Sequence, residues 1–167
     1  MALKLDLEAS IVGVVTKDND ISTVKAEINK RRKLRLLTGT TAGKADLMFS
    51  DTRTLSASAS EELDLAGGLS DPFGASLTFV KVVAIMLIAA EGNANNVVLG
   101  GAASNGFVGP FADSSDKIAV PPGGCVLLTA PAAGWTVTPA TGDLLKIANS
   151  GGTTGVTYDL IVVGRSA

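Results

Sequence analysis

The most informative chemical feature of this 167-residue chain is a missing residue type, because it contains no histidine. Histidine is the usual general base near neutral pH and the commonest metal ligand. Its absence excludes Ser–His–Asp and Cys–His catalysis and nearly all zinc sites. Ser22 and Lys25 match the spacing of a serine–lysine pair, but they lie in a charged segment rather than in the context of a nucleophile. We therefore expect no enzymatic activity, no cofactor and no metal.

Two further segments have the composition of ligand loops without the full pattern. Gly39–Lys44 is rich in glycine and ends in lysine, but it has three residues between the glycines and Ala45 where a phosphate loop needs a hydroxyl. Lys17–Asp20 is rich in calcium-type ligands, yet Thr23 and Asn29 stand where an EF-hand needs glycine and glutamate. The first segment predicts a flexible turn and the second a polar turn.

Three acids and one cysteine complete the chemical inventory. As part of a strand, Glu62 and Asp64 would share one face and Glu61 would lie on the other. Paired carboxylates can hydrolyse glycosidic bonds. However, one Trp and one Tyr leave few aromatic platforms for a sugar, so we interpret the acids as a solvated or intersubunit surface. Cys125 has no partner for an intrachain disulfide and is predicted to be a small buried hydrophobic residue.

A run of basic residues is the charge feature that most clearly calls for a partner. It consists of Lys30, Arg31, Arg32, Lys33 and Arg35. As a strand, the run would place positive charge on both faces. Three interpretations stay open: contact with an acidic protein surface, which we prefer, a solvated stretch, or contact with nucleic acid. Nucleic acid ranks last because no aromatic residue interleaves the run and the whole chain has a net charge of −2.

The elements that must position these residues are predicted to be strands. Hydrophobic residues make up 46% of the chain and charged residues only 18%, with 19 glycines, which is typical of short strands joined by tight turns. Alternation over Ser22–Asn29 also favours a strand, although Val24 and Ile28 would fit one face of a helix as well. Further candidate strands are Asp46–Ser50, Arg53–Ser58, Glu61–Leu65, Ser76–Ala90, Asn96–Leu99, Lys117–Val120, Gly124–Thr129, Trp135–Thr138, Leu144–Asn149 and Val156–Gly164. The predicted fold is all-β, a jelly-roll-like antiparallel β-sandwich over residues 46–167 with an N-terminal arm over residues 1–45.

The longest apolar stretch bears on both the core and the membrane. Phe79–Ala90 is interrupted by Lys81 and is too short to cross a bilayer, so we expect no membrane partner. Val80–Ile88 is apolar on both faces. It is therefore predicted to be a central strand, covered by the opposite sheet on one side and by the arm or a neighbouring subunit on the other. The first residues show no secretory pattern, and we expect a soluble protein made in a cytoplasm.

Residues 46–167, about three quarters of the chain, resemble the capsid decoration, or cement, proteins of tailed bacteriophages. The likeness is one of strand-and-turn style, and it carries over no functional residues. The segments that carry it are Phe49–Leu55, Glu62–Gly67, Phe79–Ala84, Asn95–Ala102, Val120–Gly124, Thr141–Asn149 and Val156–Gly164. The resemblance implies a jelly-roll-like structural protein on the surface of a virion.

The function expected from this resemblance is to stabilise a phage head through many contacts with the major capsid protein. A homotrimer is the preferred state, since it suits the three-fold points of a head, and residues 1–45 would reach a neighbouring subunit by strand addition. Synthesis in the host cytoplasm and location on the capsid follow. The alternatives are a tail, neck or fibre component and a carbohydrate- or receptor-binding β module.

Overall fold

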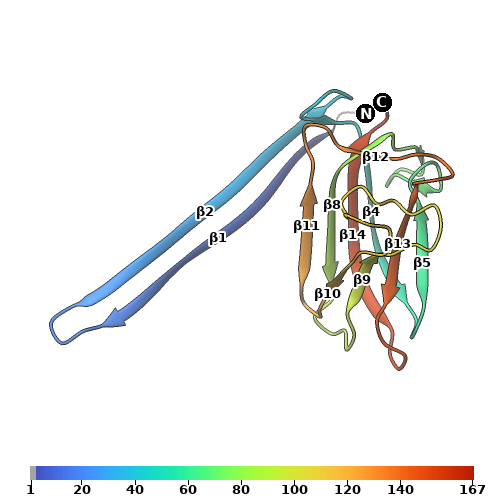
Figure 1. The fold of residues 1–167 in the computed structure, drawn as a ribbon. Coiled ribbons are helices and arrows are strands. Elements are labelled where there is room, and N and C mark those ends of the chain that lie inside the picture. The colour runs from blue at the N-terminus through green and yellow to red at the C-terminus, as the bar shows by residue number, and fades with distance from the viewer. Residues whose placement is uncertain (1–2) are drawn as a thin grey trace.

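The computed structural model describes residues 3–167, and its regular elements in that range are all strands, with no helix (Figure 1). The all-β prediction is therefore confirmed. The strands are β1 (Lys4–Asp18), β2 (Thr23–Thr38), β3 (Lys44–Ala45), β4 (Leu47–Leu55), β5 (Ser60–Asp64), β6 (Leu69–Ser70), β7 (Ser76–Leu77), β8 (Lys81–Ala89), β9 (Val97–Gly100), β10 (Lys117–Val120), β11 (Cys125–Thr129), β12 (Trp135–Thr136), β13 (Leu144–Asn149) and β14 (Val156–Arg165).

Two antiparallel sheets form the two layers of a sandwich. The five-stranded sheet has the order β11-β8-β14-β4, with β12 added beside β8, and the four-stranded sheet has the order β10-β9-β13-β5. Figure 1 shows the two sheets facing each other. The main apolar core lies between them and includes Phe79, Ile85, Leu99, Ile147 and Leu160. Burial of this apolar surface is the main force that holds the layers together.

The C-terminal strand β14 shows how sequence alternation produces this layering. Val156, Tyr158, Leu160 and Val162 are buried in the core between the sheets. The residues between them point to the other side of the five-stranded sheet, because successive side chains of a strand alternate. The predicted strand Val156–Gly164 is confirmed, with one further residue at its end.

A β-bulge in the adjacent strand β8 turns one extra apolar residue outward. Val163 pairs with Ala84 and Gly164 pairs with Val82, so Val83 is an additional residue in β8. Val83 and Ala84 both belong to a second apolar cluster on the outer face of the five-stranded sheet. The prediction that this strand is covered on both sides is confirmed only in part. The opposite sheet covers its inner face, and the outer face is covered at Val83 and Ala84, whereas Met86 and Ile88 farther along are only half-buried. Its outer cover is the start of the β1–β2 hairpin, which contributes Leu3 and Leu36 to that cluster.

The strands β1 and β2 form a long antiparallel hairpin of fifteen residue pairs, from Lys4 opposite Leu37 to Asp18 opposite Thr23. Figure 1 shows this hairpin in blue, leaving the sandwich at one end and projecting away from β11. At about 3.3 Å per residue, the strand β1 is about 50 Å long. Beside the hairpin, β3 pairs with the last two residues of β2 in parallel.

Several predicted strand boundaries are wrong. The predicted strands Asp46–Ser50 and Arg53–Ser58 are one continuous strand, β4, because both halves pair with β14. Conversely, the predicted strand Ser76–Ala90 is divided into β7 and β8. Between them, the amides of Phe79 and Val80 donate to carbonyls outside β8, those of Leu65 and Arg165. The strand Lys4–Asp18 was not predicted at all.

Candidate protein-interaction surface

The distal part of the β1–β2 hairpin is the most exposed part of the molecule, since every residue from 8 to 33 is exposed. It nevertheless carries many large apolar side chains, namely Ile11, Val12, Val14, Val15, Ile21, Val24 and Ile28, which are between 51% and 99% exposed. Clustered exposed apolar residues on a monomer mark sites of protein contact. A lone two-stranded hairpin is also marginally stable in water. We therefore take the distal hairpin as the candidate functional site.

The pairing register divides the hairpin into two faces. The inner face is the one whose first residues pack on the outer side of the five-stranded sheet, through Leu5, Leu7, Leu34 and Leu36. Because side chains alternate, this face continues outward from the sandwich through odd-numbered residues of β1 and even-numbered residues of β2. Its distal members are Ala9, Ile11, Gly13, Val15, Lys17, Val24, Ala26, Ile28, Lys30 and Arg32.

The predicted basic run lies on β2 and is exposed throughout. The register places Lys30 and Arg32 on the inner face and the other three basic residues on the outer face. The expectation that a strand would carry positive charge on both faces is therefore confirmed. Whether the run binds another protein stays a prediction.

On the outer face, two of the basic residues already have acidic partners within the hairpin. The Arg35 guanidinium donates from Nε and Nη2 to the two carboxylate oxygens of Asp6, at 2.8 and 3.2 Å. The hydrogen bond from Arg35 lowers the pKa of Asp6. Arg31 Nη1 lies 3.7 Å from Glu8 Oε1. These exposed pairs align the two strands of the hairpin, and each adds little stability.

The inner face differs, because its charged residues Lys17, Lys30 and Arg32 are all positive. No ion pair joins any of them to an acid within residues 3–167. Four residues of this face, Ala9, Ile11, Lys30 and Arg32, line a shallow groove of about 370 Å³ together with Ser10 and Arg31 of the outer face. The inner face thus combines uncovered apolar surface with positive charge.

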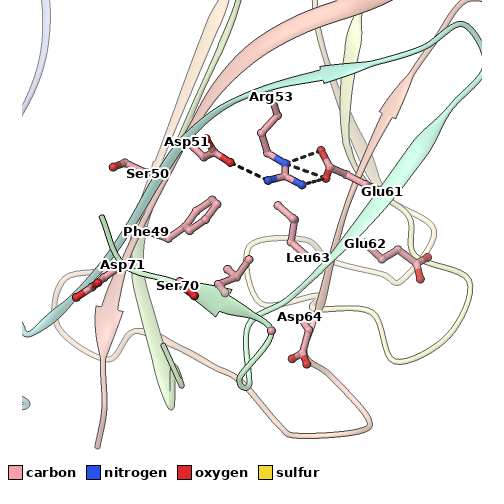
Figure 2. Close-up of a pocket in the computed structure, with 12 residues that line it drawn as sticks. Phe49, Ser50, Asp51, Arg53, Glu61, Glu62, Leu63, Asp64, Ser70 and Asp71 are labelled. Atoms are coloured by element: carbon pink, nitrogen blue, oxygen red, sulfur yellow. Dashed lines mark hydrogen bonds and ion pairs between the residues drawn. The ribbon is translucent and has the colours of Figure 1, made fainter. Parts of the chain in front are cut away.

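The acidic residues singled out in the sequence line an open pocket of about 540 Å³ at the edge of the sandwich (Figure 2). Arg53 of β4 is one of the lining residues and donates to Glu61 of β5 from Nε at 2.8 Å and from Nη2 at 2.5 Å. Arg53 Nη1 also donates to Asp51 at 2.8 Å. Figure 2 shows Glu62 and Asp64 pointing away from Arg53, as the alternation of a strand predicts.

A buried tyrosine completes this cluster. The Tyr158 hydroxyl donates to the Glu61 carboxylate. Burial opposes ionisation of Glu61, but the hydrogen bonds from Arg53 and Tyr158 outweigh it and lower the pKa of Glu61. Burial and the neighbouring Glu61 carboxylate raise the pKa of Tyr158. Arg53 and Glu61 link the two sheets at their β4 and β5 edges. A structural role, stabilising the sandwich, therefore accounts for this cluster.

The structure also locates the two candidate ligand loops and the cysteine that were singled out in the sequence. In the Gly39–Lys44 turn, the Gly43 amide donates to the Pro131 carbonyl and the Gly39 amide to that of Ala45, so neither is free to hold a phosphate. The predicted polar turn after Lys17 is the loop of the hairpin, residues 19–22, closed by a hydrogen bond from the Asn19 amide to the Ser22 carbonyl. The prediction for Cys125 is wrong: it is exposed, because it lies on the edge strand β11 with its side chain outward.

Sequence reasoning missed the apolar residues of the inner face. A signal was present, since two periodic segments flank a short polar turn at residues 19–22, as expected for a hairpin.

Across residues 3–167, no group of three or more Cys, Asp or Glu residues is arranged to hold a metal ion. In the same range, no helix is long and apolar enough to cross a membrane.

Comparisons of the chain with family models, with curated proteins and with solved structures gave no match.

Proposed function

We propose that this chain is a structural protein of a tailed-bacteriophage particle, which decorates the head and binds the major capsid protein through the β1–β2 hairpin. The observation that carries the proposal is the distal hairpin, with 26 consecutive exposed residues that include large apolar side chains. Such a surface has no role in the packing of its own sandwich and suits contact with another protein. The sequence resemblance to decoration proteins supports the choice of a phage head.

In this proposal, residues 46–167 form a jelly-roll-like module and residues 1–45 form an N-terminal arm. The contacts of Leu3 and Leu36 with the outer cluster support an arm that is held at a set angle rather than loosely tethered. Rigid presentation lowers the entropy that is lost when the arm binds. On the outer face, the basic residues Arg31, Lys33 and Arg35 would meet an acidic patch of the capsid.

The proposed unit is a homotrimer, because several arms that bind at once raise the overall affinity without any new type of contact. Three arms about one axis also match the three-fold positions of a head. A tail, neck or fibre component could use the same hairpin. The number of copies per particle separates these roles, since a head decoration requires hundreds and a tail component requires six to a few tens.

A shortened hairpin tests the proposal. Deleting residues 10–17 and 24–31 removes eight consecutive residue pairs and keeps the native loop. The even number preserves which face each remaining side chain occupies. We expect this variant to retain the folded sandwich, seen as an unchanged thermal midpoint, and to lose at least tenfold in co-sedimentation with capsids that lack the protein. Wild-type binding by the shortened variant would refute the proposal.

Two charge variants sharpen the test. Arg31→Glu with Lys33→Glu reverses charge on the outer face of the hairpin, and we expect it to weaken capsid binding at least tenfold at low salt. Lys117→Glu with Lys146→Glu makes the same change in charge on the sandwich and is the matched control. Equal losses in the two variants would show that net charge rather than the hairpin controls binding. Deletion of all residues 1–45 is a poorer test, because it also uncovers Val83 and Ala84.

A further inference from the structure

Charge is divided unequally between the two parts of the chain. Residues 1–45 hold nine of the fourteen basic residues and five of the sixteen acidic ones, which gives a net charge of +4. Residues 46–167 hold five basic and eleven acidic residues, a net charge of −6. The hairpin segment of one copy is therefore attracted to the sandwich of another, while two sandwiches repel each other.

The outer face of the five-stranded sheet consists of cross-strand rows that are covered to different extents. The first row contains Thr129, Ala84, Val163 and Met48. In this row, Ala84 and Val163 are buried beneath the hairpin, in the cluster that contains Leu36. In this row, the proximal part of the inner face packs on the outer face of the sheet.

The next two rows continue this surface but are only partly covered. They are Leu127, Met86, Ile161 and Ser50, then Cys125, Ile88, Asp159 and Thr52. Met86, Ile88 and Ile161 are half-buried, while Asp159 is exposed. We call these two rows the uncovered rows. Ile88, Asp159 and Ile161 line an open groove of about 480 Å³ there.

The charge in the uncovered rows matches that of the distal inner face. Their one charged residue is Asp159, which accepts a hydrogen bond from Thr52 Oγ1 at 2.5 Å and has no ion pair within residues 3–167. The inner face of the hairpin offers Lys30 and Arg32 without an acid. The uncovered rows are thus an apolar strip with one negative charge, and the distal inner face is an apolar strip with positive charges. The two surfaces are therefore complementary in charge.

The hairpin of the same copy leaves these rows largely uncovered, although Ile161 packs against the cluster that contains Leu36 and Leu127 shares a cavity with the hairpin. Near the sandwich, the hairpin and the sheet line a cavity of about 140 Å³ between them, formed by Leu7, Ala9, Arg32 and Leu34 with Leu127, Thr129 and Pro131. Beyond this point the hairpin is exposed on all sides, and Figure 1 shows it diverging from β11. Apart from this contact near Arg32, the distal inner face and the uncovered rows of one copy are therefore both left open.

We infer that the distal inner face of the hairpin docks on the uncovered rows of a second copy of this chain. Ile11, Val15, Val24 and Ile28 would cover Met86, Ile88 and Ile161, with Lys30 and Arg32 beside Asp159. The two surfaces differ, so the contact is heterologous, and it forms a ring such as the proposed trimer where the rotation between successive copies closes. The inference rests on the self-association proposed above and does not depend on which particle the protein belongs to.

Matched pairs of substitutions on the two faces test this docking. Ile11→Ser with Val15→Ser changes the inner face, whereas Val12→Ser with Val14→Ser changes neighbouring exposed residues of the outer face. By sedimentation velocity over a range of concentrations, we expect a wild-type oligomer, at least tenfold weaker association for the inner-face variant, and wild-type association for the outer-face variant. A monomeric wild type, or equal weakening in both variants, would overturn the inference.

Charge reversal identifies the receiving surface. Lys30→Glu with Arg32→Glu should weaken association at least tenfold, and so should Asp159→Lys alone. Combining all three restores opposite charges across the contact and should recover most of the association. Failure of the combined variant to recover, when each parent is folded by circular dichroism, would rule out Asp159 as the partner of these cations.

The single cysteine provides an independent reporter, because Cys125 is exposed in the third of these rows. Introducing Ile28→Cys on the inner face should give disulfide-linked multimers under mild oxidation, which disappear when Cys125 is replaced by serine. Val12→Cys on the outer face should give few. These measurements use purified protein without capsids. A negative result would therefore contradict the docking between copies but not capsid binding, and a loss of capsid binding would not contradict the docking.

Discussion

The Tyr158 hydroxyl donates a hydrogen bond to the carboxylate of Glu61, and this bond joins β14 of the five-stranded sheet to β5 of the four-stranded sheet. The two residues are 97 positions apart in the chain. The tyrosine ring is buried in the apolar core while its oxygen reaches the polar edge. A single side chain therefore contributes both to the core and to the polar link between the layers.

Tyr158→Phe tests the polar part of this contribution. It keeps the ring and removes the donor to Glu61, so we expect a loss of about 1–2 kcal/mol in the free energy of unfolding. Urea denaturation followed by far-ultraviolet circular dichroism measures it. A change below about 0.3 kcal/mol would show that Arg53 alone satisfies Glu61.

The lowered pKa of Glu61 predicts how stability depends on pH. Because the folded pKa lies below the ordinary value of 4.5, the contribution of Glu61 is complete above 4.5 and is lost as the pH falls through the folded pKa. Glu61→Gln should be less stable than the wild type at pH 7 and should lose less stability between about pH 5 and pH 3. Glu62→Gln, a neighbouring exposed acid outside the cluster, is the control and should follow the wild type.

The base of the hairpin should contribute measurably to stability. Leu36 is fully buried, while its neighbour Leu37 is 51% exposed. We expect Leu36→Ala to cost about 2–4 kcal/mol of unfolding free energy, because it leaves a cavity above Val83 and Ala84. Leu37→Ala should stay within about 0.5 kcal/mol of the wild type. Equal effects in urea denaturation would contradict the packing of the hairpin on the sheet.

The bulge in β8 depends on a glycine in β14. A Cβ atom at Gly164 would lie 2.3 Å from the Lys81 carbonyl oxygen and 2.4 Å from the Phe79 ring. Gly164→Ala should therefore destabilise the protein by about 1–3 kcal/mol, as overpacking against backbone does. Gly13→Ala, where a Cβ atom has no neighbour within 4 Å, should have no destabilising effect. Thermal unfolding of the two variants compares them directly.

Local patterns were enough to predict the all-β class and several strands. Lys117–Val120 and Leu144–Asn149 agree with the structure residue for residue, and Val156–Gly164 differs by one residue. These segments lie between turn residues, and β13 and β14 also alternate between core and partly exposed positions. Where one face of a strand is buried, the sequence period and the structure coincide.

The position of the basic run on a strand, with positive charge on both faces, was also within reach of the sequence, but the division of the hairpin into a face that packs on the sandwich and a face that does not was beyond it. That division depends on which face of the hairpin meets Val83 and Ala84, and the hairpin is exposed on both faces beyond that point. The sequence period alone gives no preference between two exposed faces. The strand β1 was missed although Lys4–Glu8 alternates between polar and apolar residues.

The amino-acid sequence by itself determined that this protein is built from strands, that it lacks histidine chemistry, and that its positive charge is concentrated near the N-terminus. Composition and short-range alternation are sufficient for these properties. Only the tertiary structure decided which residues meet across long distances in the chain, such as Tyr158 with Glu61 and Leu36 with Val83. The pairing order of strands and a single bulge set those contacts, and both arise from packing of the whole chain.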